Sequence, residues 1–343
     1  MPTAGAPALE TEPVASCPVC GTRERTLLHD GLTDRVFGVA PGTWALQRCA
    51  SCAGAYLDPR PAAAALPAIY ASYYTHNAPE VEPQPTGTLM RVRRRLRNGY
   101  VDARYGLRLE PAWRAGALAF RLLAPQRAGA DRMFRHLPLA GRMLDVGCGN
   151  GQFVAYAAAA GWRASGIDVD PAGVEAGRSA GLDLRVALLA DVAAEEPGGY
   201  DAITLSHVIE HVPDPAALLR AARAALRPGG TIWLATPNLR SAGHEAYGRD
   251  WLHLDPPRHL VLFTPGSLRL ALEQAGFRDV RAAPAVPEAR LLFGLSQAVR
   301  EGRRPEGAGA PVPRALALRA ARADLRNLVR PDRAEEVVLL ATA

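Results

Sequence analysis

The sequence RMLDVGCGNG, Arg142 to Gly151, gives the clearest indication of the fold of this chain. It joins an apolar run, Met143 to Val146, to three alternate glycines and then to an alanine-rich segment, Gln152 to Ala160, with the composition of a helix. Glycine suits such a turn, because it adopts backbone angles closed to other residues and lets the main chain approach a ligand closely. The stretch therefore predicts a strand, a tight turn and a helix, as in a βαβ nucleotide site.

A second predicted strand ends in an acid after one helix's length of chain. It reads GIDVD over residues 166–170. In a βαβ nucleotide site, an acid at the end of the second strand accepts hydrogen bonds from ribose hydroxyls. A G-x-G-x-G pattern alone would be a weak signal, but here it lies between two predicted strands. Asp168 is therefore a candidate ribose ligand.

The glycine spacing and several later segments resemble class I S-adenosylmethionine-dependent methyltransferases. With Asp145 before it, the G-x-G-x-G loop resembles motif I of that family and differs from the dinucleotide pattern G-x-G-x-x-G. The likeness covers roughly residues 140–283 in a fixed order. The later segments are YDAITL (200–205), HVIEHVPDP (207–215), LRPGG (226–230) and the strand 231–235. The resemblance implies an α/β fold with a Rossmann-like sheet, parallel except for one antiparallel edge strand.

Predicted strands alternate with alanine-rich helices, which indicates right-handed crossovers and a parallel sheet covered on both faces. The expected strands are 142–146, 164–168, 183–187, 200–205 and 231–235. A helix at 265–275 and strands at 280–283 and 335–341 complete the domain, and the family topology makes the last two an antiparallel pair at the sheet edge. Residues 285–334 are an expected insertion, with helical segments near 288–302 and 313–330.

The resemblance also implies how the cofactor is held. Asp145 would fix the methionine ammonium, directly or through water, and Asp168 would bind the ribose hydroxyls. Asp191, ten residues before Asp201, fits the acid that meets the adenine amino group. Cys148 is expected to be a small loop residue, because a sulfonium donor needs no covalent intermediate. The expected cofactor-binding residues are Asp145, Gly147, Cys148, Gly149, Asn150, Gly151, Asp168, Val169 and Asp191.

Methyl transfer from a sulfonium is an in-line displacement, so alignment supplies most of the catalysis. An oxygen acceptor benefits from a base whose pKa lies near neutrality, which histidine offers. His207 and His211 follow the fourth strand, at the edge where ligands bind, and both are candidates. The segment resembles that of ubiquinone-pathway O-methyltransferases, in which an E-x-x-E-H arrangement is associated with a divalent ion. Here His207 replaces the first acid, ahead of Glu210 and His211.

The segment WLHLDPPRHLVLF, residues 251–263, follows the fifth strand and commonly faces the acceptor in this family. Its histidines and arginine beside a tryptophan suit a hydroxylated or phosphorylated substrate. The alternative is that Pro256-Pro257 stiffens a loop whose aromatic side chains pack.

Two C-x-x-C pairs near the N-terminus, Cys17 with Cys20 and Cys49 with Cys52, have the pattern of a tetrahedral zinc site. Disulfides are disfavoured in a chain without a secretion signal, and a redox centre would not require the second pair. Because all four ligands are cysteines, we expect a structural zinc that takes no direct part in catalysis.

The ribbon, the sequence DPRP at 58–61 and a helical stretch with Ile69, Tyr70, Tyr73 and Tyr74 resemble a bacterial group of zinc-ribbon methyltransferases. That group is often associated with glycan or natural-product modification. The tyrosines would either cover the acceptor site or pack the ribbon against its neighbour. The arginine-rich stretch that follows would contact an anionic acceptor or a membrane surface, or form the solvated face of a helix.

The chain divides into five expected parts, from composition and motifs. They are a disordered tail (1–16), a zinc-ribbon-like domain with the tyrosine helix (17–77), a proline-rich linker (78–88), a helical connector (89–138) and the methyltransferase domain (139–343).

Composition excludes some functions. The chain of 343 residues carries a net charge of +6, but all 40 of its basic residues are arginines and it contains no lysine. This indicates genomic composition bias more than a nucleic-acid surface, and it rules out lysine Schiff-base chemistry. No run approaches the length of a membrane span, and the N-terminus lacks the features of a secretion signal. We expect a cytoplasmic protein, and peripheral membrane contact stays open.

These features predict an S-adenosylmethionine-dependent methyltransferase with a structural zinc, acting on a hydroxyl of a sugar, a glycan or a secondary metabolite. A second interpretation is an RNA or protein methyltransferase that recognises a macromolecule through its ribbon and arginines. A third is a non-catalytic cofactor-binding or assembly protein that has kept the fold.

Overall fold

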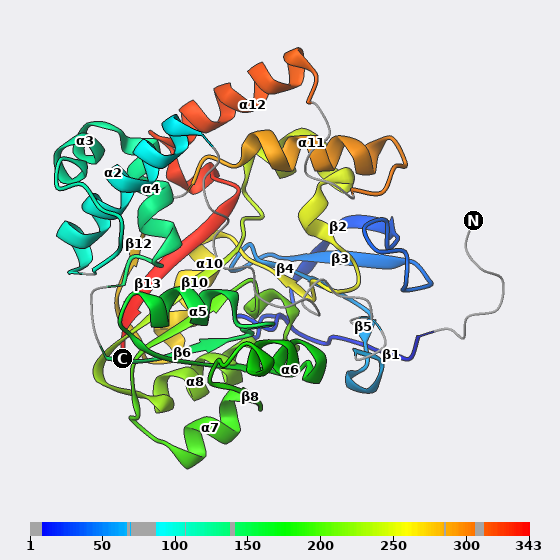
Figure 1. Cartoon of the computed structure of the whole chain (residues 1–343). Coiled ribbons are helices and arrows are strands. Elements are labelled where there is room, and N and C mark those ends of the chain that lie inside the picture. Colours follow the sequence, from blue (N-terminus) through cyan, green and yellow to red (C-terminus); the bar gives the residue numbers. More distant parts are fainter. Residues whose placement is uncertain are drawn as a thin grey trace.

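A computed structural model gives the structure of the chain (Figure 1). It describes residues 9–66, 69, 87–106, 108–137, 141–284, 286–305 and 312–343. Tyr70, Tyr73, Tyr74 and residues 78–86 of the expected linker lie outside the described residues. Ile69, from the same expected helix, is described and buried.

A seven-stranded sheet forms the centre of the molecule, in the order β12-β13-β10-β9-β6-β7-β8. All neighbouring strands from β10 to β8 pair in parallel, and β13 is antiparallel to both β10 and β12. The α/β Rossmann-like fold class is confirmed, with the one antiparallel strand lying one position in from the edge. The strands are β6 (Arg142–Val146), β7 (Arg163–Asp168), β8 (Leu184–Val186), β9 (Tyr200–Ser206), β10 (Leu226–Pro237), β12 (Arg278–Ala282) and β13 (Glu336–Thr342).

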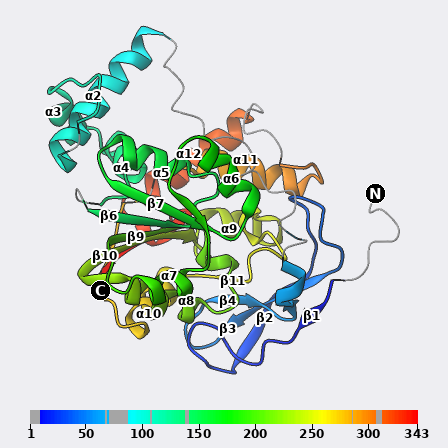
Figure 2. The ribbon, with the colours of Figure 1, turned by 60° about the horizontal axis from the view of Figure 1, so that its bottom comes forward.

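Helices cover both faces of this sheet, and Figure 2 shows α5 and α6 on one side with α7, α8 and α10 on the other. Three of these helices, α6, α8 and α10, begin with a polar cap, as where Asp170 accepts hydrogen bonds from the backbone N–H groups of Ala172 and Gly173. Because both faces are covered, the central strands are apolar. The helices are α5 (Gln152–Ala159), α6 (Pro171–Ser179), α7 (Leu189–Glu195), α8 (Pro215–Ala225) and α10 (Pro265–Gln274).

Strand order reverses between β6 and β9, since the chain runs from β6 outward to β8 and then returns to β9. Ligands in open α/β sheets bind at such a reversal, beyond the carboxyl ends of the strands. The glycine loop follows β6, and His207 follows β9. The topology therefore brings the two predicted halves of the site together.

Residues 17–57, which contain four cysteines and are called the cysteine-rich part below, contribute three strands to a second sheet, in the order β11-β4-β3-β2. Its first strand in that order, β11, comes from the loop after β10 and pairs with β4. Trp44 and Tyr56 of this part belong to the same buried core as Leu144 and Leu205 of the large sheet. The expected ribbon domain is therefore packed into the methyltransferase region. The strands are β2 (Arg25–Leu32), β3 (Trp44–Cys49), β4 (Ala55–Leu57) and β11 (Val261–Leu262).

Residues 9–16 are ordered, so the expectation of a disordered tail up to residue 16 is wrong for this part of it. Strand β1 (Thr11–Glu12) pairs with β5 (Arg60–Pro61). Val14 is buried, and its N–H donates to Asp58 Oδ1 at 2.8 Å. Composition suggested disorder, whereas these contacts with the DPRP segment fix the chain.

The connector and the insertion are helical, as expected. The connector helices α2 (Thr88–Tyr105), α3 (Gly116–Leu122) and α4 (Ala124–Met133) share a small core around Tyr100 and Phe120. In the insertion, α11 (Ala289–Arg300) packs against α9 (Ala242–Tyr247) and two short 3-10 turns, and α12 (Arg314–Asn327) follows. The turns are η4 (Gly248–Asp250) and η5 (Leu252–Leu254). Among the described residues, no helix is long and apolar enough to cross a membrane.

Candidate functional site

The glycine loop needs glycine at two of its three positions for measurable reasons. Gly147 has a φ of +69°, and a Cβ there would lie 2.4 Å from Val208 Cγ2. Gly151 has a φ of +79°, and a Cβ there would lie 2.7 Å from Leu182 Cδ1. The N–H of Gly147 donates to Ile167 O at 2.8 Å. The loop is thus held tightly between the ends of β6, β7 and β9.

Asp168 ends β7 and closes the loop from the other side. Its Oδ2 accepts from the N–H of Gly149 at 2.7 Å, and its Oδ1 accepts from the N–H of Asp170 at 2.9 Å. Burial raises the pKa of Asp168, against the effect of these two hydrogen bonds. The half-buried carboxylate lies where the sequence predicts a ribose ligand.

Asp145 is buried and has an ion-pair partner that the sequence did not reveal. Arg135, from the turn after α4, contacts Asp145, and Thr204 Oγ1 donates to Asp145 Oδ1 at 2.7 Å. The Arg135 guanidinium lies 3.6 Å from the centroid of the Phe153 ring. Burial lowers the pKa of Arg135, and Asp145 opposes this shift. A cofactor ammonium at Asp145 would therefore share the carboxylate with a buried arginine.

Other expected cofactor residues surround the loop. Cys148 is buried, and burial raises the pKa of its thiol, which favours the neutral form of a small loop residue. Asn150 Oδ1 accepts from the N–H of Gln152 at 3.2 Å. Val169 is 67% exposed beside Asp168, and Asp191 is exposed in the first turn of α7.

His207 lies between two carboxylates. Its Nε2 is 2.5 Å from Glu336 Oε1, and its Nδ1 is 3.2 Å from Glu210 Oε1. Burial alone would lower the pKa of His207, but the two carboxylates outweigh it and raise the pKa to about 10. Glu336 also pairs with Arg132 at 3.2 Å. The ring is therefore protonated at neutral pH, with a carboxylate oxygen close to each nitrogen, which does not suit a base.

His211 has the opposite environment. Its Nδ1 lies 3.1 Å from the backbone oxygen of Arg258, and because a carbonyl only accepts, Nδ1 carries the proton and Nε2 the lone pair. Burial, and then the neighbouring His259, lower the pKa of His211 to about 4. His211 is thus a neutral imidazole at neutral pH, and the two histidines predicted as equal candidates differ in charge.

Glu210, His211 and His259 bring one possible ligand atom each to within 4.8 Å of one another. Glu210 is fully buried, and its Oε1 lacks hydrogen-bond geometry to any described residue, including His207. Like His211, His259 donates its Nδ1–H to a backbone oxygen, that of His253, at 2.7 Å. Two Nε2 lone pairs and a carboxylate oxygen suit a divalent ion, with carbonyls orienting both rings. His259 would supply the third ligand, which the E-x-x-E-H pattern would place at residue 207.

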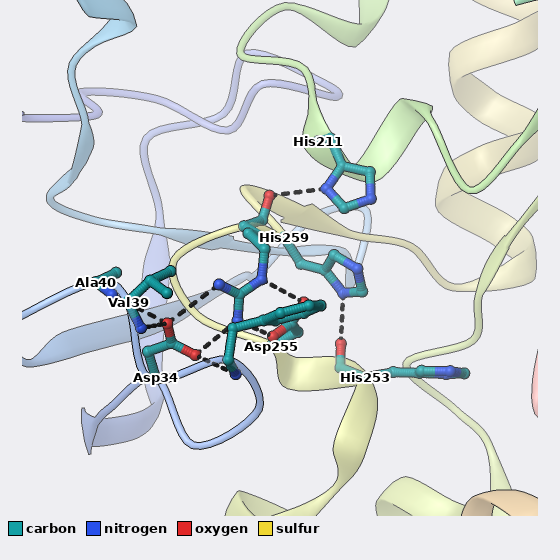
Figure 3. Close-up of polar contacts among 9 residues, drawn as sticks. Asp34, Val39, Ala40, His211, His253, Asp255 and His259 are labelled. Carbon is teal, nitrogen blue, oxygen red and sulfur yellow. Dashed lines mark hydrogen bonds and ion pairs between the residues drawn. The ribbon is translucent and has the colours of Figure 1, made fainter. Parts of the chain in front are cut away.

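The segment 251–263 has a structural role at two of the positions expected to face the acceptor. Trp251 is buried, and Arg258 is fully buried and paired with Asp34 and Asp255. Figure 3 shows these two carboxylates facing each other across the pair. The hypothesis that Arg258 holds the substrate directly is therefore not supported. The two histidines of this segment lie beside the histidines that follow β9. The ring centroid of His253 is 6.2 Å from that of His207, and the ring centroid of His259 is 4.7 Å from that of His211.

The four N-terminal cysteines gather at one point, with their sulfur atoms within 4.8 Å of one another. Cys17 and Cys52 are 3.6 Å apart, and Cys20 and Cys49 are 3.4 Å apart. Each pair of ligands lies in a tight turn closed by a backbone hydrogen bond, from Gly21 N to Cys17 O and from Ala53 N to Cys49 O. This donor set fits a tetrahedral ion such as zinc.

The sequence of this chain is similar to those of known methyltransferases over its central part. Residues 118–282 match a family model described as a methyltransferase domain. A "Ubiquinone biosynthesis O-methyltransferase" of Xanthomonas campestris pv. campestris is 44% identical over 103 residues, which is 28% of this chain and 43% of the relative. The enzyme of that name from Xanthomonas oryzae pv. oryzae is 43% identical over 115 residues, 32% of this chain and 48% of the relative. The chain thus spans less than half the length of these relatives.

Among solved structures, a S-adenosylmethionine-dependent methyltransferase from Archaeoglobus fulgidus is 18% identical, with a TM-score of 0.44, over 65% of this chain and 94% of that chain. The matched residues 118–282 include the glycine loop, Asp168 and the turn with His207 and His211. Residues 118–282 therefore match a methyltransferase domain, and the sheet that they contribute to has the Rossmann-like strand order.

Proposed function

We propose that this protein transfers the methyl group of S-adenosylmethionine to a hydroxyl oxygen of a small acceptor, a sugar, a glycan or a secondary metabolite. The observation that carries the proposal is the meeting of two sets of side chains at one edge of the sheet. Asp168 and the glycine loop lie on the cofactor side, and the histidines after β9 and β10 lie beside them. The O-methyltransferase relatives favour oxygen as the acceptor atom.

On the cofactor side, Asp145, Asp168 and the loop residues Gly147 to Gly151 would hold the methionine and ribose parts. Exposed apolar side chains, Val169 at 67% and Leu188 at 58%, follow β7 and β8 and would cover the faces of the adenine. Asp191, one helical turn beyond Leu188, would meet the adenine amino group.

On the acceptor side, we assign the central role to His211. It presents a neutral Nε2 lone pair, whereas His207 is held as a cation by Glu210 and Glu336. A neutral imidazole has a lone pair that can take the proton of the acceptor hydroxyl as the methyl group arrives, and its lowered pKa makes it a weaker base than a free histidine. His207 would instead keep Glu210 and Glu336 in place.

The resemblance to ubiquinone-pathway enzymes implies a divalent ion, and Glu210, His211 and His259 fit one. When bound there, the ion would act as a Lewis acid on the acceptor oxygen. The Nε2 lone pair of His211 would either accept the proton or bind the divalent ion, and removal of divalent ions with a chelator distinguishes these two roles. Activity that survives chelation assigns proton transfer to His211, and activity that is lost and restored by a divalent ion assigns it as a ligand.

The cysteine cluster would hold a structural zinc, with all four positions taken by thiolates and none open to substrate. Its proposed role is to stabilise the sheet to which β11 adds a strand.

The experiment that tests the function is transfer of labelled methyl from S-adenosylmethionine into an extract of the source cells. The extract is then fractionated into small molecules, lipid-linked glycans, RNA and protein, and Asp168→Ala serves as the inactive control. Label in the small-molecule or glycan fraction, absent with the control, is the expected result. Label in RNA or protein would contradict the proposed acceptor class, and no label in any fraction would favour a non-catalytic role.

A further inference from the structure

The loop that carries His253 and His259 is joined to the cysteine-rich part by a buried ionic cluster (Figure 3). The fully buried guanidinium of Arg258 lies 2.7 Å from Asp34 Oδ1 and 2.5 Å from Asp255 Oδ1. Asp34 belongs to the segment between β2 and β3, whereas Arg258 and Asp255 lie between β10 and β11. The cluster thus joins segments that are 224 residues apart in the sequence.

Asp34 is built to hold this contact. Its side chain is 2% exposed, and its carboxylate also accepts from the backbone N–H groups of Phe37, Val39 and Ala40 at 2.9–3.1 Å. Burial would raise the pKa of Asp34, but Arg258 and these N–H groups lower it to about 2. The Arg258 guanidinium also lies 4.1 Å from the centroid of the Phe37 ring. The carboxylate is therefore rigid and charged at neutral pH.

The backbone of Arg258 faces the acceptor side. Its carbonyl oxygen accepts from Nδ1 of His211, and two residues further on the N–H of Leu260 donates to Glu210 O at 2.7 Å. The side chain of Arg258 is thus fixed by the cysteine-rich part, while its main chain decides which nitrogen of His211 carries the proton.

We propose that Asp34 is a positioning residue of the acceptor site, which holds Arg258 and thereby fixes the Nδ1–H tautomer of His211. The cysteine-rich part then contributes to the chemistry of the site through one salt bridge, besides contributing to stability. The importance of this tautomer rests on the proposed function, but the tautomer itself is a property of the protein without cofactor or acceptor.

The test is nitrogen-15 NMR of the histidine rings in the full-length protein, comparing wild type with Asp34→Asn, and assigning His211 by its loss in His211→Gln. Wild type should show a protonated Nδ1 and an unprotonated Nε2. Asp34→Asn should show a mixture of tautomers, because the Arg258 carbonyl is no longer fixed. Arg35→Gln is the matched control, since it removes the adjacent contact with Asp250, 2.8 Å long, and should leave the wild-type signals unchanged.

Binding of S-adenosylhomocysteine, measured by calorimetry, checks that each variant folds. If Asp34→Asn does not fold, Arg258→Lys replaces it, because an ammonium keeps the charge but not the forked contacts with two carboxylates. A folded variant of either kind with the wild-type tautomer would overturn the proposal, because pairing of β11 with β4 would then suffice to hold the loop. Failure of wild type to bind S-adenosylhomocysteine would contradict the proposed function. The NMR comparison would still test whether Asp34 fixes the tautomer of His211.

Discussion

Gly147 shows how one residue determines the shape of the cofactor side. Its left-handed backbone is costly for other residues, and the space that a Cβ would need is filled by Val208. Val208 is the residue next to His207, so the glycine loop and the histidine turn pack directly against each other. A change at this glycine therefore affects both halves of the site.

Gly147→Ala should weaken binding of S-adenosylhomocysteine about tenfold, because the free loop would relax away from the left-handed conformation, and binding would have to restore it at a cost of about 1–2 kcal/mol for alanine. Calorimetry measures the affinity. Adding Val208→Ala removes the 2.4 Å contact but not the backbone cost, so the double variant should recover only part of the loss. Unchanged affinity in Gly147→Ala would place the cofactor elsewhere.

The sequence could not separate His207 from His211, because their partners are distant. Glu336, which holds His207, is 129 residues away, and Arg258, whose carbonyl orients His211, is 47 residues away. Both histidines occupy the same short motif, and only tertiary contacts give them different charges. Arg135 is only 10 residues from Asp145, but no sequence motif joins the two, and their contact too depends on the tertiary fold.

At the scale of elements, the sheet could be predicted from the sequence because its signals are local. Strand β6 has the predicted bounds, and helices α11 and α12 lie within the predicted helical segments. Strand β11 was missed, because two residues, Val261–Leu262, give no periodic pattern and pair with β4 across the chain. The ordered strand β1 was missed for the same reason.

Arg258→Leu should lower the free energy of unfolding by about 3–5 kcal/mol, because it leaves the buried carboxylates of Asp34 and Asp255 without their cation. Arg35→Leu removes a partly exposed ion pair with Asp250 and should cost at most about 1 kcal/mol. Urea unfolding measures both. Equal losses would contradict the importance given to the buried cluster.

At the scale of the whole molecule, the cysteine-rich part and the methyltransferase domain behave as one folded unit. They share a core, and β11 adds to the smaller sheet. They also meet at His29 and His244, whose Nε2 atoms are 3.0 Å apart. Since Nδ1 of His244 donates to Leu239 O, its Nε2 accepts, and His29 must be the donor.

This histidine contact should make stability depend on pH. Burial, and then the nearby His244, Arg249 and Arg48, lower the pKa of His29 from 6.5 to about 4. Between these values the unfolded chain binds a proton that the folded chain does not, so stability should fall as pH drops, by up to about 3 kcal/mol. Urea unfolding at pH 7 and at pH 5 measures how much free energy of unfolding is lost as the pH falls. This loss should be smaller for His29→Gln than for wild type, and an equal loss in both proteins would show that His29 is not its cause.

Metal analysis tests the cysteine cluster at the same scale. The purified protein should contain at least about one zinc per chain, and Cys17→Ser should lose one equivalent and unfold at a lower temperature, because binding energy at a structural zinc site is folding energy. Substitution of the fifth cysteine, Cys148→Ser, is the matched control and should keep the zinc. A wild-type protein without metal and with unchanged stability after Cys17→Ser would contradict a structural zinc.

Calorimetric titration of S-adenosylhomocysteine into wild type, Asp168→Ala and Asp183→Ala tests whether the cofactor binds at the glycine loop. Asp183 is an exposed acid just before the amino end of β8, the strand next to β7, and makes a matched control. We expect binding to wild type and to Asp183→Ala. In Asp168→Ala the affinity should fall by roughly 10- to 100-fold, because the hydrogen bonds to a charged group are lost. Equal affinity in all three proteins would contradict the placement of the cofactor at the glycine loop.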